Sequence, residues 1–121
     1  MSYIDGFVVP VPFAKKDAYR EMAQKAAALF KEHGALRVVE CWGDDVPEGT
    51  ITDFRRSVKS DAQENIVFSW IEWPSKEARD EANERMKTDS RMKIPDDLPF
   101  DGSRMIFGGF EVLVDAKAEK A

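Results

Sequence analysis

The alternation of apolar and polar positions predicts four strands and two helices. Runs rich in β-branched and aromatic residues, bounded by proline or glycine, are typical of strands. Such runs occupy Tyr3–Val11, Ala35–Gly43, Asn65–Trp73 and Arg104–Val114. Apolar residues recur instead at helical spacing over Asp17–His33 and Ser75–Thr88. The predicted order of elements is therefore β-α-β-β-α-β.

The ends of both helices have sequence signals. In the first helix we expect Asp17 as N-cap and Gly34 as the glycine that follows the last turn. Its predicted apolar face consists of Ala18, Met22, Ala26, Leu29, Phe30 and His33. Ser75, directly after Pro74, is a good N-cap for the second helix.

Two connecting segments are less regular. Thr50–Val58 alternates weakly, which is consistent with an added strand or with a loop arm. Asp89–Gly102 contains two prolines and is predicted to be irregular. The charged tail, about residues 115–121, is expected to fray. A chain of 121 residues is the size of one domain, so we expect a single domain over residues 1–121.

Right-handed connections between these elements predict an α+β, ferredoxin-like fold: an antiparallel sheet with two helices on one face. The predicted strands are apolar on both faces, as Phe68 and Trp70 alternate with Val67 and Ile71. Two helices cover only one of these faces. The simplest cover for the other face is a second copy of the sheet, which predicts a homodimer in the form of a dimeric α+β barrel.

Composition excludes several classes of protein. The formal net charge is −5, which disfavours binding to nucleic acid. The chain has no apolar run approaching the ~20 residues of a membrane helix, and its N-terminus does not resemble a signal peptide. A single cysteine, Cys41, allows no intrachain disulfide, which favours a cytoplasmic protein. One histidine and one cysteine disfavour a His/Cys zinc site within one chain, and no residue is singled out as a metal ligand.

Several segments resemble the signature segments of a known bacterial family. They are Tyr3–Pro12 (YIDGFVVPVP), Val39–Pro47 (VECWGDDVP), Val67–Ile71 (VFSWI) with Trp73–Ser75 (WPS), and Pro99–Gly102 (PFDG) with Arg104–Glu111 (RMIFGGFE). Together they resemble the YbaA-like family, which is defined as a domain of unknown function. The resemblance spans nearly the whole chain and implies a dimeric α+β barrel. It implies no known reaction, so no catalytic residue follows from it.

Carboxylates inside the predicted strands are the first candidates for chemistry. They are Asp5, Glu40, Glu72 and Glu111. The first and last strands are expected to be neighbours, and a plausible register sets Asp5 across from Glu111. Two carboxylates that face each other repel and tend to share a proton, which is how a general acid or base, or an oxygen-ligand metal site, is built. The favoured alternative places each carboxylate at a rim of the sheet or in a pair with Arg37, Arg56 or Arg104.

His33, the only histidine, is the third catalytic candidate. Imidazole titrates near neutral pH, so His33 could act as a base at the mouth of a cleft. Its place in the last turn of a helix favours a simpler role, because imidazolium complements the C-terminal end of the helix dipole.

The candidate ligand-binding residues are aromatic side chains and a glycine pair. They are Trp42, Phe68, Trp70, Phe107, Gly108 and Gly109. They could line a pocket for a flat apolar molecule, with the glycines allowing close approach. The alternative is that the aromatics belong to the core or to the dimer interface. The glycine pair lacks the spacing of a phosphate loop, and the sequence predicts no cofactor.

Three functions remain open. The preferred hypothesis is a small-molecule binding protein with a cleft between sheet and helices. The second is a cofactor-free enzyme such as an oxygenase or isomerase, which is an analogy from fold alone. The third is a structural or interaction dimer without a ligand. A carboxylate with a strongly raised pKa, or His33, inside a cavity favours the enzyme. A cavity of roughly 300 Å³ or more without such a group favours the binding protein. A filled core with an exposed apolar patch outside the dimer interface favours the third hypothesis.

Overall fold

The computed structural model describes residues 2–93 and 95–119. The strands are β1 (Tyr3–Pro12), β2 (Arg37–Trp42), β3 (Glu64–Trp73) and β4 (Ile106–Glu111). The α-helices are α1 (Lys16–Glu32), α2 (Phe54–Ser57) and α3 (Lys76–Lys87), and short 3-10 turns occupy Phe13–Lys15, Ser90–Met92 and Gly102–Arg104. The four strands form one antiparallel sheet in the order β2-β3-β1-β4, which confirms the α+β class. None of the described helices is long and apolar enough to cross a membrane.

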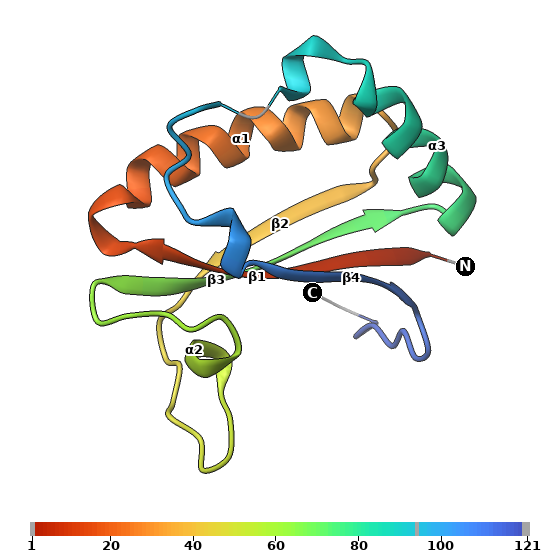
Figure 1. The fold of residues 1–121 in the computed structure, drawn as a ribbon. Coiled ribbons are helices and arrows are strands. Elements are labelled where there is room, and N and C mark those ends of the chain that lie inside the picture. The colour runs from red at the N-terminus through yellow and green to blue at the C-terminus, as the bar shows by residue number, and fades with distance from the viewer. Residues whose placement is uncertain (1, 94, 120–121) are drawn as a thin grey trace.

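Figure 1 shows how the helices lie relative to the sheet. The long helices α1 and α3 lie on one face, whereas α2 belongs to a loop arm that projects beyond the opposite face. Of the two alternatives for Thr50–Val58, the added strand is therefore wrong. Asp53 explains the helical turn, since its side chain caps α2 by accepting a hydrogen bond from the backbone N–H of Arg56 at 2.8 Å.

Other predicted boundaries need small corrections. Ser75 is confirmed as the N-cap of α3, because its hydroxyl accepts from the N–H of Ala78 at 3.0 Å. Asp17 is not the N-cap of α1, since a 3-10 turn leads into a helix that begins at Lys16. The last strand is shorter than predicted, because residues 102–104 form a turn capped by Asp101.

The core lies between the sheet and the two long helices, in two clusters of buried residues. One consists of Tyr3, Ala35, Ile71, Trp73 and Ala82, and the other of Val9, Val11, Tyr19, Ala23 and Val67. Helix α1 therefore buries Tyr19 and Ala23, while Ala18 of the predicted face is exposed. The predicted face is correct for Met22 and Phe30, which pack against these clusters. It omits Tyr19, whose ring packs edge-on against Phe100 at 5.7 Å.

Helix α3 is tied to the sheet by a polar network around Arg79. The guanidinium donates to the Tyr3 hydroxyl at 2.8 Å, and its Nε lies 3.7 Å from a carboxylate oxygen of Asp5. The other Asp5 oxygen accepts from the indole N–H of Trp73 at 2.9 Å. Gly109 of β4 lies directly against Tyr3 and Arg79, so the network extends to the edge of the sheet.

The opposite face of the sheet has no long helix over it (Figure 1). Because side chains alternate along a strand, the positions between the core residues point to this side. They include Ile4 and Val8 of β1, Cys41 of β2, Ile66, Phe68 and Trp70 of β3, and Ile106, Gly108 and Phe110 of β4. We call this set the open face. Phe54 from α2 packs edge-on against Phe68, with ring centroids 6.0 Å apart.

The glycine pair of β4 offers a test of this packing. A Cβ at Gly109 would collide with the Tyr3 ring and the Arg79 guanidinium, whereas a Cβ at Gly108 would meet the Phe110 ring at an ordinary 3.5 Å. Gly109→Ala should therefore destabilise the protein by about 1–3 kcal/mol, as overpacking does. Gly108→Ala should be neutral or stabilising by up to ~1 kcal/mol, through the unfolded state. Urea unfolding of both variants measures the difference, and equal stabilities would contradict the close approach at Gly109.

Candidate functional site

A groove of about 520 Å³ lies between α1 and the β2 and β3 strands. Its apolar walls are formed by Tyr19, Ala23, Ala27, Val38, Trp42 and Val67. Two of these on α1 are alanines and the strand residue Val38 is small, so helix and sheet do not fill the space between them. The polar side chains that line the groove are Lys16, Arg20, Gln24 and Glu40.

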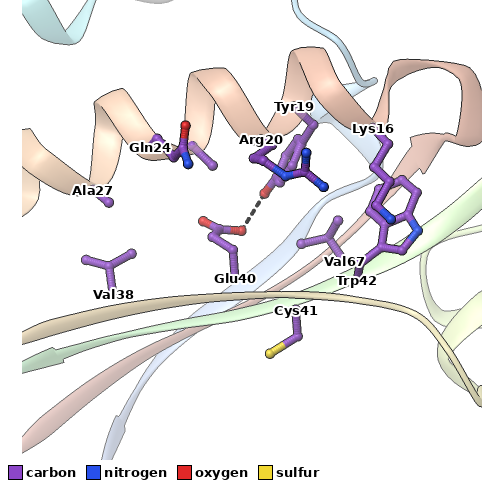
Figure 2. Close-up of a pocket in the computed structure, with 11 residues that line it drawn as sticks. Lys16, Tyr19, Arg20, Gln24, Ala27, Val38, Glu40, Cys41, Trp42 and Val67 are labelled. Carbon is purple, nitrogen blue, oxygen red and sulfur yellow. Dashed lines mark hydrogen bonds between the residues drawn. The ribbon is translucent and has the colours of Figure 1, made fainter.

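The centre of the groove is a hydrogen-bonded pair. Alternation along β2 turns Val38, Glu40 and Trp42 toward α1 and turns Cys41 to the other side of the sheet (Figure 2). The Tyr19 hydroxyl reaches down from α1 and donates to Glu40 Oε1 at 2.7 Å. Tyr19 is buried, and the pair joins the helix to the sheet within the groove.

The pair has shifted protonation equilibria. Part of the Glu40 side chain is open to solvent, but desolvation of its carboxyl group raises the pKa of Glu40, against the opposing effect of hydrogen bonds from Tyr19 and Ser69. Burial, with the neighbouring Glu40 carboxyl as the second cause, raises the pKa of the Tyr19 hydroxyl. At neutral pH Tyr19 therefore remains a hydrogen-bond donor, and Glu40 holds a proton more readily than an ordinary carboxyl group.

One end of the groove is aromatic and cationic. The Lys16 ammonium lies over the Trp42 ring, 5.4 Å from its centroid, and Phe13 packs edge-on against the same ring at 6.3 Å. Arg20 follows Lys16 by one helical turn, and its exposed side chain pairs with the exposed Asp17 at 3.2 Å. This end can therefore offer positive charge beside a flat apolar surface.

The predicted opposition of Asp5 and Glu111 is wrong. Asp5 lies across from Gly109, and Glu111 lies across from Tyr3, two residues along the ladder. Asp5 is instead paired within the Arg79 network, where it contacts Trp73 and Arg79. The alternative of a pair with arginine holds for Glu72, whose carboxylate lies 3.8 Å from Arg37. No acid or base site arises between β1 and β4 from this register.

His33 also lies apart from the groove. It directly follows the last residue of α1, and its Nε2 lies 2.9 Å from Asp89 Oδ2. Hydrogen bonds from Arg91 first, and from His33 second, lower the pKa of Asp89. Glu32, His33 and Asp89 have the spacing of metal ligands, but the Arg91 guanidinium bonds to both carboxylates. The cluster therefore connects α1 to the segment after α3. Because Arg91 bonds to both carboxylates, few of their oxygens remain free to bind a metal ion.

The candidate ligand-binding residues are distributed over three places. Among the described residues of that set, Trp42 alone lines the groove. Phe68, Trp70 and Gly108 belong to the open face, and Gly109 contacts Tyr3. Phe107 stacks on Phe7 at 6.3 Å on the helix side of the sheet, near its edge.

Lys16, Arg20 and Gln24 line the groove although the sequence did not single them out. The central site residue that sequence reasoning missed is Tyr19. Its signal was present, because Tyr19, Ala23 and Ala27 follow one another at four-residue spacing on the predicted helix. Such spacing places an aromatic ring with a hydroxyl on the same face as two small residues. Its partner Glu40 had been singled out only as one of four strand carboxylates.

The raised pKa of Glu40 predicts a pH dependence of stability. Because the pKa in the folded protein exceeds its ordinary value of 4.5, the folded state holds this proton more tightly than the unfolded chain. The contribution of Glu40 to stability is therefore greatest at low pH and falls as the pH rises above 4.5 through the folded-state pKa. The Tm of Glu40→Gln should therefore rise relative to the Tm of the wild type as the pH increases from about 4 to about 7.

Thermal melts across this range provide the measurement. Glu21→Gln, which removes an exposed carboxylate from α1, is the control for the loss of one negative charge. A constant difference in Tm between Glu40→Gln and wild type would contradict the raised pKa of Glu40.

Comparison with known proteins agrees with the resemblance found in the sequence. Residues 2–102 match the family described as "Protein of unknown function (DUF1428)". The chain is 65% identical over 116 residues to "Uncharacterized protein YbaA" of Escherichia coli (strain K12), an alignment that covers 95% of this chain and 99% of the relative. A protein of the same name from Shigella flexneri matches equally well, with 65% identity over the same coverage. The chain belongs to the DUF1428 family, together with these YbaA proteins.

Proposed function

We propose that the protein binds a small, flat and largely apolar molecule in the groove between α1 and the sheet. The observation that carries this proposal is a groove of about 520 Å³ whose mostly apolar walls surround one carboxyl group. Small-molecule sites commonly combine a volume of roughly 300–1,000 Å³ with apolar walls and few polar groups. Tyr19 and Trp42 supply the flat surfaces of the walls.

Glu40 would fix the orientation of the ligand. Its Oε1 accepts the Tyr19 hydroxyl, and Figure 2 shows the other carboxylate oxygen pointing away from Tyr19, along the groove toward the Val38 end. A ligand hydroxyl, amide or amine that donates to this second oxygen would complete the hydrogen bonding of the carboxyl group. Because the Glu40 side chain is exposed at the groove, this oxygen is within reach of a donor group on a bound ligand.

Filling the groove should abolish binding of a neutral apolar probe. Ala27 lines the groove, whereas the next residue, Ala28, is exposed on α1. We expect the fluorescent dye phenylnaphthylamine to bind the wild type and Ala28→Phe alike. Its affinity for Ala27→Phe should fall by roughly tenfold or more, because a phenyl group occupies the space of the dye.

Fluorescence titration measures these affinities, and circular dichroism verifies that each variant is folded. Equal dye binding by Ala27→Phe and Ala28→Phe would place the dye elsewhere and overturn the proposed site.

A cofactor-free enzyme, such as an isomerase, is the second candidate. The observation in its favour is Glu40, since a carboxyl group with a raised pKa inside a groove is suited to accept a proton. In that case Glu40→Gln would retain ligand binding but lose proton exchange between a bound compound and D2O. A binding protein would catalyse no such exchange, either as the wild type or as Glu40→Gln.

We further propose that the open face is covered by a second copy of the chain, which would give a ferredoxin-like, dimeric α+β barrel. The strand order β2-β3-β1-β4 and the position of both long helices on one face support this arrangement (Figure 1). The exposed side chains Phe68, Ile106 and Phe110 give the face an apolar surface. A two-fold axis through it would let each sheet cover the other. The alternative of a pure interaction module draws support from Ile51, Leu113 and Val114, which are exposed outside this face.

A charge at the centre of the open face should separate the copies. Phe68 lies on β3, one of the two inner strands, so Phe68→Glu would bury a carboxylate in the proposed interface. We expect the wild type to sediment as a dimer and Phe68→Glu as a folded monomer. Leu36→Glu, at an exposed apolar residue just before β2, should remain dimeric. A monomeric wild type, or a dimeric Phe68→Glu, would contradict the barrel.

A further inference from the structure

We propose that the ligand of the groove is a small organic acid with a single carboxylate or sulfonate, held at the Lys16 and Arg20 end. This inference rests on the proposed binding function and adds the chemical class of the ligand. The acid group would lie beside Lys16, Arg20 and Trp42, and the apolar body would extend along the groove toward Glu40.

The charge of the groove differs in sign from that of the chain. The whole protein has a formal net charge of −5, so its average field repels anions. The groove is lined by two cations, Lys16 and Arg20, and by one carboxyl group, Glu40. With Glu40 ionised, the lining has an excess of one positive charge, and Asp17, which does not line the groove, pairs with Arg20 at 3.2 Å. An anionic ligand is therefore favoured locally on a molecule that otherwise disfavours it.

The two cations are placed to act together. Residues 16 and 20 are four apart on α1, so their side chains are neighbours on one face of the helix. Figure 2 shows Lys16 beside the Trp42 ring and the Arg20 guanidinium extending toward the same end of the groove. Guanidinium presents parallel N–H groups that match a carboxylate or sulfonate, and ammonium adds a second charge.

Neither cation is held by a strong partner among the described residues. The Arg20 pair with Asp17 is at 3.2 Å, but the two side chains are 58% and 91% exposed. Such exposed pairs contribute little and are readily exchanged. Lys16 contacts the Trp42 ring at 5.4 Å, which leaves its three N–H groups free to donate. Both side chains can thus turn onto a bound anion without breaking a buried interaction.

Glu40 restricts the ligand further. Its carboxyl group would repel a second anionic group, so a diacid that spans the groove is disfavoured. A hydrogen-bond donor at the far end of the ligand would instead meet its free oxygen, as the proposed function requires. The structure therefore favours a monoanionic, amphipathic acid with a donor group over a neutral, cationic or doubly charged ligand.

Two matched dyes test the class of ligand. Anilinonaphthalene sulfonate and phenylnaphthylamine share the same aromatic body and differ by one sulfonate. At low ionic strength we expect the sulfonate to bind the wild type more tightly, by about tenfold for two weakly screened charges. In the double variant with Lys16→Gln and Arg20→Gln this advantage should disappear, so that the two dyes bind with similar affinities.

Lys15→Gln is the matched control, because Lys15 is adjacent and exposed but does not line the groove. It should keep the preference for the sulfonate, and Ala27→Phe should lose binding of both dyes. If phenylnaphthylamine binds in the groove but the sulfonate has no advantage, or if Lys15→Gln abolishes that advantage as fully as the double variant, this inference fails and the proposed binding function stands. If Ala27→Phe affects neither dye, the proposed function itself fails.

Discussion

Two long helices have to cover one face of a four-stranded sheet, and most features of this protein follow from that constraint. Helix α1 has 17 residues and α3 has 12, so each spans only part of the sheet. Where α1 crosses β2, the facing side chains are small, and the space between them remains a groove. On the other side of the sheet, the constraint leaves apolar side chains with no long helix over them (Figure 1). The groove and the open face thus have one common origin.

The carboxylates of the sheet are of two kinds. Some are paired with other side chains and stabilise the fold, and one has an oxygen that could bind a ligand. Glu64 is buried and receives both arms of the Arg104 guanidinium, at 2.8 and 2.6 Å, and these bonds are the main cause of its lowered pKa. Asp5 is likewise held by Trp73 and Arg79. Glu40 differs, since its charged form is disfavoured by desolvation and one of its oxygens points along the groove. A paired carboxylate stabilises structure, whereas one with spare hydrogen-bonding capacity can bind a ligand.

The two proposed binding surfaces lie on opposite faces of the same strands. Along β2, Trp42 points into the groove and the adjacent Cys41 points to the open face (Figure 2). A ligand in the groove and a second copy on the open face would therefore not compete for space. Both the ligand and the second copy would contact side chains of β2 and β3. A shift of this shared backbone on binding at one surface could therefore change binding at the other.

The sequence by itself determined the elements and the class of the fold. Strand and helix periodicity, the Ser75 cap and the Gly34 terminus are local properties, and each depends on residues a few positions apart. The match of signature segments likewise identified the family. The register of β4 could not be found in this way, because a shift by two residues keeps every side chain on the same face and leaves the pattern unchanged. Only the tertiary structure decided that Asp5 faces Gly109, and that Tyr19 meets Glu40 across 21 residues of sequence. These pairings depend on how α1 packs on the sheet and how the strands align, which are contacts between distant parts of the chain.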